Sequence, residues 1–338
     1  MRRYFGVDLH RNCFTVCELK ENGENEITQP SIKSLGDFAK KLRSTDELAV
    51  EATGNTKYFC DELKNSGCKI VVVNPSQFQV ISRSVSKTDE NDAQTLAKFL
   101  SKGMLPEVRM KDKLQAQIAS LVQTRDKLVK LRTILKNKIN NLLAGEGILI
   151  KKESLSSEKS MVTLLDNDLE DITRIELEVM ISQIASLNKS VEKLDLAIKD
   201  KGKDLSGHKN LKSIKGIGDF GASVLASVIG DIKHFRDEGE LASYMGIVPR
   251  VCNSNETMRS GRITKRGSKI GRTTLVQCSL IAMRYSPYLA SFYKRVKTTR
   301  GTGKAIIALA RKFLGIIFKT LKNNWIFESF PDFVLAKQ

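Results

Sequence analysis

Four acidic residues have the side-chain type and the spacing of a site that holds divalent cations. Asp8 ends an apolar, strand-like run near the N-terminus, and Glu51 ends a second run of the same kind. Asp89 and Asp92 lie three residues apart at the start of a helix-like segment, so their side chains share one helix face. These carboxylates can converge on one or two Mg²⁺ ions, which prefer oxygen ligands and can assist phosphodiester chemistry. Taken singly, Asp89 could be only a helix cap and Glu51 a solvated strand end.

The first hundred residues combine strand-like and helix-like segments that would position these acids. Strands are expected at 4–7, 13–19, 48–51 and 69–73, and helices are expected at 34–42, 57–66 and 92–100. The last of these strands is a β-branched run, which is typical of a buried parallel strand. Because strands alternate with helices, we expect a mixed sheet covered by helices and predict an α/β domain at 1–108.

A heptad repeat of leucines marks the middle of the chain. Leucine recurs at every seventh position, at Leu114, Leu121, Leu128, Leu135 and Leu142. After a glycine-containing break, a second apolar repeat runs from Leu177 to Ile198. Heptads of this kind are typical of packed helices. We therefore predict a coiled-coil helical hairpin at 109–203, which either spaces two domains or forms a dimer seam.

Two arginines interrupt the leucine repeat. Arg125 and Arg132 occupy alternate core positions of the heptads, where apolar residues are usual. They weaken the case for a simple dimer seam, and they could instead pair with acids such as Glu176 or Glu178.

A glycine-rich segment opens the C-terminal part of the chain, which we predict to be a helical domain at 204–330. Ile214-Lys215-Gly216-Ile217-Gly218 resembles the turn of a helix-hairpin-helix motif. The glycines let the backbone approach phosphate oxygens, which the N–H groups of the next helix can bind. Lys215, Gly216 and Gly218 are therefore candidate DNA contacts, although an ordinary glycine-rich helix connection is the alternative. Further helices are expected at 268–283 and 304–322.

Positive charge is concentrated in the C-terminal part of the chain. The formal net charge is +18, and residues 246–325 contain 17 Lys or Arg and a single acid, Glu256. A solvated basic surface is one interpretation, but the asymmetry favours a face that binds nucleic acid through its phosphates. Outside the glycine-rich turn, the candidate phosphate contacts are Lys87, Arg250, Arg262, Lys265, Arg266 and Arg272.

The composition argues against several other classes of protein. No run of 18 or more apolar residues appears, so neither a membrane span nor a membrane partner is expected. The N-terminal apolar stretch is too short for a signal peptide, so we expect a cytoplasmic protein. Six cysteines without a Cys-x-x-Cys pair, together with only three histidines, disfavour a zinc site and predict reduced, mostly buried thiols.

A set of short motifs runs through both halves of the chain. In the first half they are Gly6-Val7-Asp8, Glu51-Ala52-Thr53-Gly54, Val71-Val72-Val73-Asn74-Pro75 and Lys87-Thr88-Asp89 with Asp92-Ala93. In the second half they are Leu211 to Gly221, Leu241 to Arg250 and Gly261 to Gly267, followed by Arg272. Their order and spacing resemble the DEDD transposases of insertion sequences, a recombinase family that includes the Piv-type DNA invertases. The resemblance covers nearly the whole chain.

The resemblance implies a fold, a reaction and a set of partners. The fold is a RuvC-like, RNase H-type domain followed by a helical domain, with Mg²⁺ held by Asp8, Glu51, Asp89 and Asp92. The reaction is the cutting and rejoining of donor and target DNA by a transposase, through a serine that becomes covalently linked to DNA. A structured bridge RNA from the non-coding end of the element guides members of this family. Joining four DNA ends favours a homodimer or homotetramer.

The family motif also implies which serine is the nucleophile. In the family it lies a few residues beyond a Pro-Arg pair, usually as the second serine of a Ser-Ser-Gly-like stretch. Here the pair is Pro249-Arg250, and the spacing selects Ser254. The surroundings depart from the family pattern, because Asn253 replaces the first serine and Asn255-Glu256 stand where glycine is common.

A serine hydroxyl is a poor nucleophile at neutral pH unless another group activates it. No histidine lies near Ser254 in the sequence. We therefore expect a composite site, in which folding or assembly brings Ser254 to the Mg²⁺ held by the four acids. Ser260, next to Gly261, is the second candidate nucleophile, and Ser268 is the third.

Two other functions are compatible with the same residues. A metal-dependent nuclease or Holliday-junction resolvase would use the acidic site and water, and would leave hydrolysed ends without a protein–DNA adduct. A non-enzymatic nucleic-acid-binding protein would use only the basic face, with the acids as structural caps. Asp8→Asn would then leave recombination unchanged.

Overall fold

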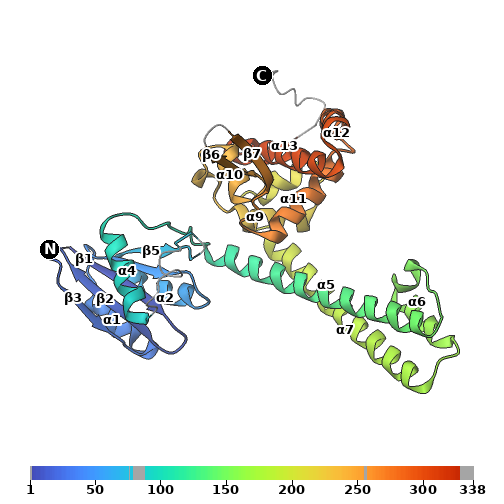
Figure 1. Ribbon diagram of the computed structural model, residues 1–338, viewed down its shortest axis with the longest axis horizontal. Helices are drawn as coiled ribbons and strands as arrows, with labels where there is room; N and C mark the ends of the chain where they lie inside the picture. The colour runs from blue at the N-terminus through green and yellow to red at the C-terminus, as the bar shows by residue number, and fades with distance from the viewer. Residues whose placement is uncertain (1, 76, 79–87, 255–256, 328–338) are drawn as a thin grey trace. The chain divides into compact units, whose positions relative to one another are not determined.

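The computed structural model describes residues 2–75, 77–78, 88–254 and 257–327, with the backbone alone described at 251–254 and 257–260 (Figure 1). The chain divides into two compact units, residues 1–110 and 111–338. The first boundary lies close to the predicted limit of the α/β domain. The predicted hairpin and helical domain both lie in the second unit, so a boundary between residues 203 and 204 stays a prediction.

The first unit is built on a mixed five-stranded sheet. Its strands are β1 (Arg3–Leu9), β2 (Phe14–Lys20), β3 (Asn25–Thr28), β4 (Glu47–Glu51) and β5 (Lys69–Val73). The strand order is β3-β2-β1-β4-β5, with β1–β2 and β2–β3 antiparallel and β1–β4 and β4–β5 parallel. This confirms the predicted α/β architecture and is consistent with an RNase H-like domain. Strand β3 was not predicted, because its four residues are all exposed and carry no apolar pattern.

Helices cover both faces of this sheet (Figure 1). They are η1 (Ile32–Ser34), α1 (Leu35–Lys41), α2 (Thr56–Leu63), η2 (Lys64–Ser66) and α4 (Asp89–Ser101). Phe5 and Val7 of β1 pack with Leu35 and Phe59 on the side of α1 and α2. The alternate residues of the sheet face α4, as the period-two geometry of a strand requires. Polar side chains near the strand ends on this second side therefore lie under α4.

Gly6 determines how closely α4 approaches β1. A Cβ atom at this position would lie 2.0 Å from the carbonyl oxygen of Ala93 and 2.5 Å from the backbone nitrogen of Ala97. The residue paired with Gly6 on β2 is Cys17, which packs with the same two alanines. Because these side chains are small, the helix lies directly on the strand. The first turn of α4 is thereby held over the end of β1.

Gly6→Val should destabilise the first unit strongly. The added side chain meets backbone atoms that cannot move without displacing α4, and overpacking of a core typically costs about 3 kcal/mol at its upper range. Urea unfolding of the full chain, followed by circular dichroism, would measure the loss. Gly36→Ala is the matched control, because a Cβ atom at Gly36 in helix α1 would contact nothing within 4 Å. Equal stability of Gly6→Val and the parent would contradict this account of the packing.

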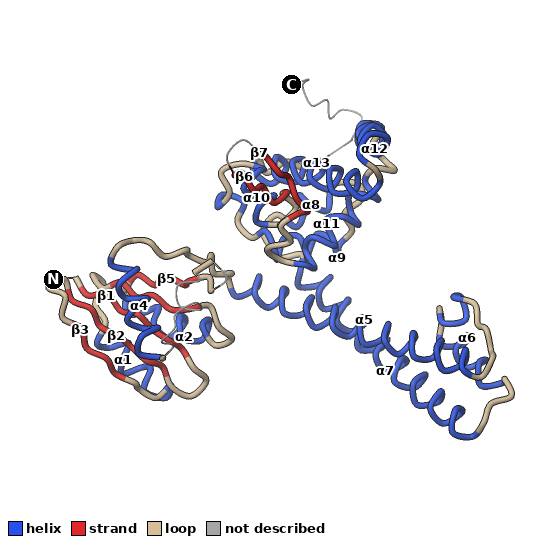
Figure 2. Tube along the Cα trace, viewed as in Figure 1, coloured by secondary structure: helices blue, strands red, loops and turns tan. Residues whose placement is uncertain are grey.

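A pair of long helices opens the second unit, in the segment where a helical hairpin is predicted (Figure 2). The helices are α5 (Lys113–Gly145) and α7 (Asp171–Gly202), connected through η3 (Lys152–Leu155), α6 (Glu158–Val162) and η4 (Thr163–Asp166). The repeating leucines of α5 are only partly buried, whereas Ile118, Val122, Ile139 and Leu143 are buried. Ile118 and Ile139 occupy the alternate core positions of the predicted heptads, so these two positions are buried as expected and the leucine positions are not fully buried. Supercoiling of the two helices stays a prediction.

The arginines of the hairpin bind polar partners within the chain. Arg125 forms a two-pronged ion pair with Asp195 on α7, in which Nη2 lies 3.1 Å from Oδ2. Its guanidinium also lies 4.5 Å from the centre of the Phe220 ring. Arg132 donates to the Asn188 side chain at 2.8 Å. The suggested partners were therefore wrong: Glu176 pairs with Lys138 instead, at 3.0 Å.

The remaining helices pack around α9, which is buried from Gly221 to Ile229. They are α8 (His208–Ser213), α9 (Asp219–Ile229), η5 (Ile232–His234), α10 (Glu238–Tyr244), α11 (Lys269–Ala282), α12 (Pro287–Arg300) and α13 (Thr302–Lys322). The helices expected at 268–283 and 304–322 are confirmed as α11 and α13. Between α10 and α11 lies a two-stranded antiparallel hairpin, β6 (Pro249–Ser254) and β7 (Thr257–Ile263), which the sequence analysis did not predict. No described helix has both the length and the apolar character to cross a membrane.

The described cysteines are free thiols, but fewer are buried than expected. Cys17 and Cys278 are buried, whereas Cys13, Cys60 and Cys68 are partly exposed. Burial raises the pKa of the Cys60 and Cys278 thiols to about 11, because removal from water disfavours the thiolate. These two thiols stay protonated at neutral pH. They are therefore poor nucleophiles.

Candidate active site

Asp8 and Glu51 lie on the side of the sheet that α4 covers. Asp8 is two residues beyond Gly6 on β1, so its side chain leaves the same face, and its side chain is 15% exposed. Glu51 ends β4, the parallel neighbour of β1, one residue after Val50, which pairs with Val7. Parallel strands bring their carboxyl ends to the same edge of the sheet. The ends of β1 and β4, which carry Asp8 and Glu51, therefore lie at the same edge of the sheet.

Asp89 and Asp92 lie in the first turn of α4. Thr88 caps this helix, because its hydroxyl accepts a hydrogen bond from the backbone N–H of Asn91 at 3.2 Å. Asp92 is 8% exposed and faces the sheet with Ala93, whereas the side chain of Asp89 is half exposed. Acids in the first turn also interact favourably with the helix dipole. The predicted capping role belongs to Thr88, which leaves the Asp89 carboxylate available to other groups.

His10 joins two of these acids. Its Nε2 atom lies 3.2 Å from Oδ2 of Asp8 and 3.0 Å from Oδ2 of Asp89. The potential ligand atoms of the three residues all lie within 4.8 Å of one another. Glu51 and Asp92 are not members of this tight set. His10 was not among the predicted site residues. Its position two residues after Asp8 was the available signal, because every second residue of an extended segment shares a face.

Hydrogen bonds join the turn that carries His10 to the loop after Glu51. The side-chain amide of Asn55 donates to the carbonyl oxygen of His10 at 2.7 Å. The Thr53 hydroxyl donates to Oδ1 of Asn55 at 3.1 Å, and the Thr56 hydroxyl donates to the Glu51 carbonyl at 2.8 Å. The backbone around two of the site residues is therefore fixed by one connected network. Such outer interactions are what orient metal ligands in proteins.

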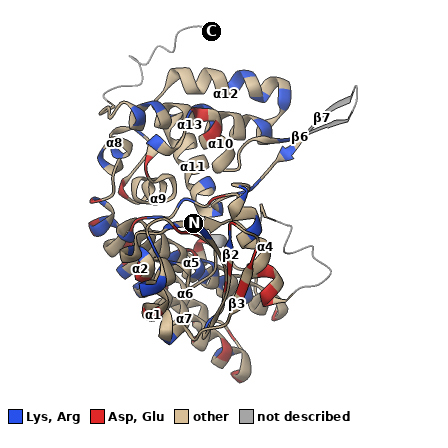
Figure 3. Ribbon diagram, turned by 90° about the vertical axis from the view of Figure 1, so that its left-hand side faces the viewer, with Lys and Arg blue, Asp and Glu red and all other residues tan. Residues whose placement is uncertain are grey.

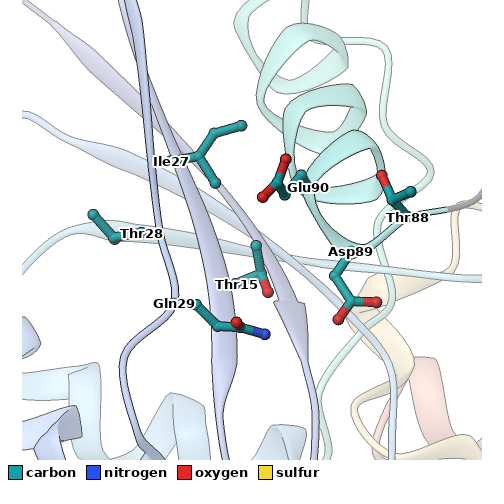
Figure 4. A pocket seen from close by; sticks show the side chains of 7 residues that line it. All are labelled: Thr15, Ile27, Thr28, Gln29, Thr88, Asp89 and Glu90. Carbon is teal, nitrogen blue, oxygen red and sulfur yellow. The ribbon is translucent and has the colours of Figure 1, made fainter.

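A polar pocket of about 590 Å³ lies beside Asp89 (Figure 4). The residues that line it are Thr15, Ile27, Thr28, Gln29, Thr88, Asp89 and Glu90. Thr15 pairs with Asp8 across β1 and β2, so the pocket continues from the same sheet face. None of the described residues that line it is a Lys or Arg.

The donor atoms of this cluster fit a divalent cation. Two carboxylates and one imidazole nitrogen converge within 4.8 Å, and Glu51 and Asp92 add carboxylates on the same side of the sheet. Carboxylates suit both Mg²⁺ and Mn²⁺, whereas imidazole nitrogen is bound better by transition-metal ions than by Mg²⁺. The first unit therefore contains the elements of a metal-assisted site for phosphodiester chemistry.

The three candidate serines occupy different positions in the second unit. Ser254 is the last residue of β6 and pairs with Thr257 at the tip of the β6–β7 hairpin. Ser260 lies within β7, opposite Val251. Ser268 caps α11, because its hydroxyl accepts a hydrogen bond from the N–H of Gly271 at 3.1 Å. The structure does not test which of the three serines is the nucleophile, and Ser254 stays a prediction.

The base of this hairpin is built from left-handed backbone and one arginine. Gly246 has φ 68°, and a Cβ atom there would lie 1.9 Å from the carbonyl oxygen of Arg266. Nη1 of Arg272 donates to the carbonyl oxygens of Met245 and Arg266, at 3.1 and 3.4 Å. Lys265 also has a positive φ of 56°. These contacts fix the two segments from which the hairpin extends.

Two family models match the chain. One, a transposase model of the DEDD, IS110 type, matches residues 5–147, and the other, described as the transposase IS116/IS110/IS902 family, matches residues 208–294. Together the matches take in the acidic cluster, the helix pair around the glycine-rich turn and the hairpin with Ser254. The chain belongs to the IS110-type insertion-sequence transposases.

Similar proteins are transposases and a DNA invertase. The transposase for insertion sequence element IS1111A of Coxiella burnetii is 24% identical, over 95% of this chain and 90% of that protein. A probable family 20 transposase of Pseudomonas aeruginosa is 25% identical, over 94% of this chain and 96% of its own length. The pilin gene-inverting protein of Moraxella bovis is 26% identical, over 97% of this chain and 98% of its own length. The transposase described here is therefore a DNA recombinase, and dependence on a metal is usual for DEDD transposases.

The glycine-rich turn of this transposase joins α8 to α9, as a helix-hairpin-helix motif would. Gly216 has φ 103°, and a Cβ atom there would lie 2.6 Å from the backbone nitrogen of Ala282 in α11. Gly218 and Lys215 are exposed. Asp219, the first residue of α9, pairs with Lys212 at 2.6 Å, and this hydrogen bond lowers the pKa of the carboxyl. Packing requires Gly216, whereas contact of the exposed Lys215 and Gly218 with nucleic acid stays a prediction.

The basic residues at the base of the hairpin are largely exposed. Among the predicted phosphate contacts, those exposed to solvent are Arg250, Arg262, Lys265 and Arg266. Figure 3 shows Lys and Arg on the strands at the start of the hairpin and along α12. Arg272 is partly buried and bonded to backbone carbonyls, so it also has a structural role. Lys87 lies outside the described residues.

Proposed function

We propose that this transposase cuts and rejoins DNA through Ser254, with Mg²⁺ or a similar divalent cation held by acids of the first unit. Those acids are Asp8, Glu51, Asp89 and Asp92. The observation that carries the proposal is the placement of four carboxylates around the first turn of α4 and the ends of β1 and β4. The bound cation would act as a Lewis acid toward phosphate oxygens.

In the proposed cutting step, the serine hydroxyl exchanges one phosphoester for another. The Oγ atom of Ser254 forms a bond to phosphorus, and the bond from phosphorus to the 3′ oxygen of the DNA breaks. The proton lost by the serine hydroxyl ends on the departing 3′ oxygen. The products are a 5′ DNA end linked to the serine and a free 3′ hydroxyl.

The rejoining step reverses this exchange with a different strand. The 3′ hydroxyl of a partner strand attacks the phosphoserine, and the bond between phosphorus and Oγ breaks. The number of phosphoester bonds stays the same, so the cycle needs no external energy source. Ser254 regains its proton and is ready for another round.

Exposed basic residues would hold the DNA backbone near the hairpin. Arg250 and Arg262 lie on β6 and β7, and Lys265 and Arg266 follow β7. Cations that face a phosphate stabilise the extra charge that develops on its oxygens during exchange. They also give the complex a strong dependence on salt concentration.

A recombination assay tests the proposed function. A plasmid carrying the gene with its natural flanking DNA is introduced into a host cell, and new DNA junctions are detected by sequencing. The transposase should produce precise junctions at the ends of the flanking element. Absence of new junctions with an expressed, folded protein would contradict the proposal.

We also propose that a structured RNA guides the choice of DNA sites. The family resemblance and the excess of Lys and Arg in residues 246–325 support this. Protein purified from cells that carry the flanking DNA should retain one discrete RNA, transcribed from beside the gene. Sequencing the retained RNA is the measurement. Recovery of only random cellular RNA would contradict guidance, while leaving the cutting chemistry to be judged by the recombination assay.

A further inference from the structure

We propose that His10 is a direct ligand of the cation in the acidic site, and that it makes the site prefer Mn²⁺ to Mg²⁺. This inference rests on the proposed function, because it assumes that Asp8 and Asp89 hold a cation. It goes beyond that function by replacing an oxygen-only ligand set with a mixed set. His10 would be the residue that makes the site distinguish Mn²⁺ from Mg²⁺.

The direction of the imidazole is the first observation. The side chain of His10 is 42% exposed, yet its Nε2 atom is shielded from solvent and directed at two carboxylates. Nε2 lies 3.2 Å from Oδ2 of Asp8 and 3.0 Å from Oδ2 of Asp89. A surface histidine without a role would more readily leave both nitrogens in water. Here the Nε2 atom lies at the point where the two acids converge.

The rigidity of the turn is the second observation. The backbone N–H of His10 donates to the Cys13 carbonyl at 3.0 Å, and its carbonyl accepts from Asn55 at 2.7 Å. Both backbone polar groups of His10 are therefore bonded, which limits the positions that its side chain can reach. Asn55 in turn follows Glu51 by four residues in the loop after β4. The ligand is held in place by the same network that orders the neighbouring acid.

Ligand chemistry supplies the preference between cations. Mg²⁺ binds oxygen almost exclusively and retains several of its waters, so it gains little from an imidazole. Mn²⁺ accepts nitrogen ligands as well as oxygen, and imidazole sites generally favour transition metals. A third, nitrogen-containing ligand therefore raises the affinity for Mn²⁺ more than that for Mg²⁺.

A purely ionic role for His10 predicts the opposite pattern. If His10 only paired with Asp8 and Asp89 as a positive charge, it would compete with every cation for the same carboxylates. Its removal would then strengthen the binding of Mn²⁺ and Mg²⁺ alike. Direct ligation predicts that removal weakens Mn²⁺ binding selectively, so the two roles differ in the sign of the effect.

The experiment is a titration of the full-length, nucleic-acid-free protein with Mn²⁺ alone and with Mg²⁺ alone, by isothermal calorimetry. His10→Ala should lower the ratio of Mn²⁺ affinity to Mg²⁺ affinity by about tenfold, mainly through weaker Mn²⁺ binding. His10→Asp, which supplies oxygen in place of nitrogen, should keep Mg²⁺ binding and still lower the ratio. Asn12→Ala, an exposed residue of the same turn, is the control and should leave the ratio unchanged.

Two results would overturn the inference. The first is a ratio in His10→Ala equal to that of the parent, and the second is a uniform gain in affinity for both cations. Asp8→Asn separates this failure from failure of the proposed function. If Asp8→Asn retains the affinity of the parent for both cations, the acidic site itself is not the cation site, and both proposals fall. If it loses both cations while His10→Ala is unchanged, only the role of His10 is wrong.

Discussion

Asp8→Asn should abolish DNA cleavage by this transposase while leaving its fold and its DNA binding intact. The amide has nearly the size and shape of the carboxylate, but it lacks the negative charge that holds a cation. Asp8 lies at the end of β1, with one carboxylate oxygen 3.2 Å from His10 and its neighbours on the face that α4 covers. Because this group is central to the cluster, we expect a loss of about a thousandfold in cleavage rate, as when a key electrostatic group is removed.

The measurement compares cleavage of end-labelled DNA with binding of the same DNA by fluorescence anisotropy. Asp37→Asn is the matched control, since Asp37 is an exposed acid of α1 in the same unit, paired with Lys40. Its cleavage rate should equal that of the parent. Cleavage by Asp8→Asn within a few-fold of the parent would show that the acids have only a structural role.

Ser254→Ala should remove the covalent protein–DNA intermediate and with it DNA cleavage. The proposed exchange needs a hydroxyl oxygen that can bond to phosphorus, and alanine offers none. The loss should reach about a thousandfold or more, the scale seen when a nucleophile is deleted. Because the acids and the exposed cations are unchanged, cation and DNA binding should match those of the parent. Denaturing electrophoresis of labelled DNA with the protein measures the adduct.

The other two serines provide the controls for this variant. Ser260→Ala should keep the adduct. Ser268→Ala should keep it too, at a stability cost of about 1 kcal/mol, because it removes the cap of α11. An adduct that persists in Ser254→Ala and disappears in Ser260→Ala would move the nucleophile to β7.

The sheet and the strand-end acids could be predicted because short-range patterns determine them. The apolar runs that end at Asp8 and Glu51 became β1 and β4, and period-two geometry places both side chains on the α4 side. Because Asp89 and Asp92 are three residues apart, their position on one face of a helix could also be predicted. These predictions used only the local sequence pattern and the rule that parallel strands have their carboxyl ends at the same edge of a sheet.

Other features depend on contacts that the local sequence does not contain. His10 gains its significance from the position of α4, which brings Asp89 within 3.0 Å of its Nε2 atom. The partner of Arg125 depends on the register between α5 and α7, which places Asp195 opposite it, and heptad spacing alone does not determine that register. Gly6 likewise looks ordinary until the backbone of α4 is seen against it.

Two residues predicted to bind nucleic acid have structural roles as well. Gly216 is required where the turn meets Ala282, and Arg272 holds the carbonyls of Met245 and Arg266. Glycine and arginine serve packing and phosphate binding equally well in a sequence, so residue type alone does not separate the two roles. The exposed Arg250, Arg262 and Lys265 remain the stronger candidates for DNA contact.

Identifying the residue that becomes joined to DNA is the sharpest test of the proposed serine chemistry. The transposase is incubated with its DNA substrate and divalent cation, quenched in denaturant, digested and analysed by tandem mass spectrometry. We expect a peptide in which Ser254 carries a 5′-phosphodeoxynucleotide, accompanied by free 3′ hydroxyl ends on the DNA. DNA cut to 5′-phosphate ends with no peptide attached would contradict it and would indicate a nuclease that uses water at the acidic site.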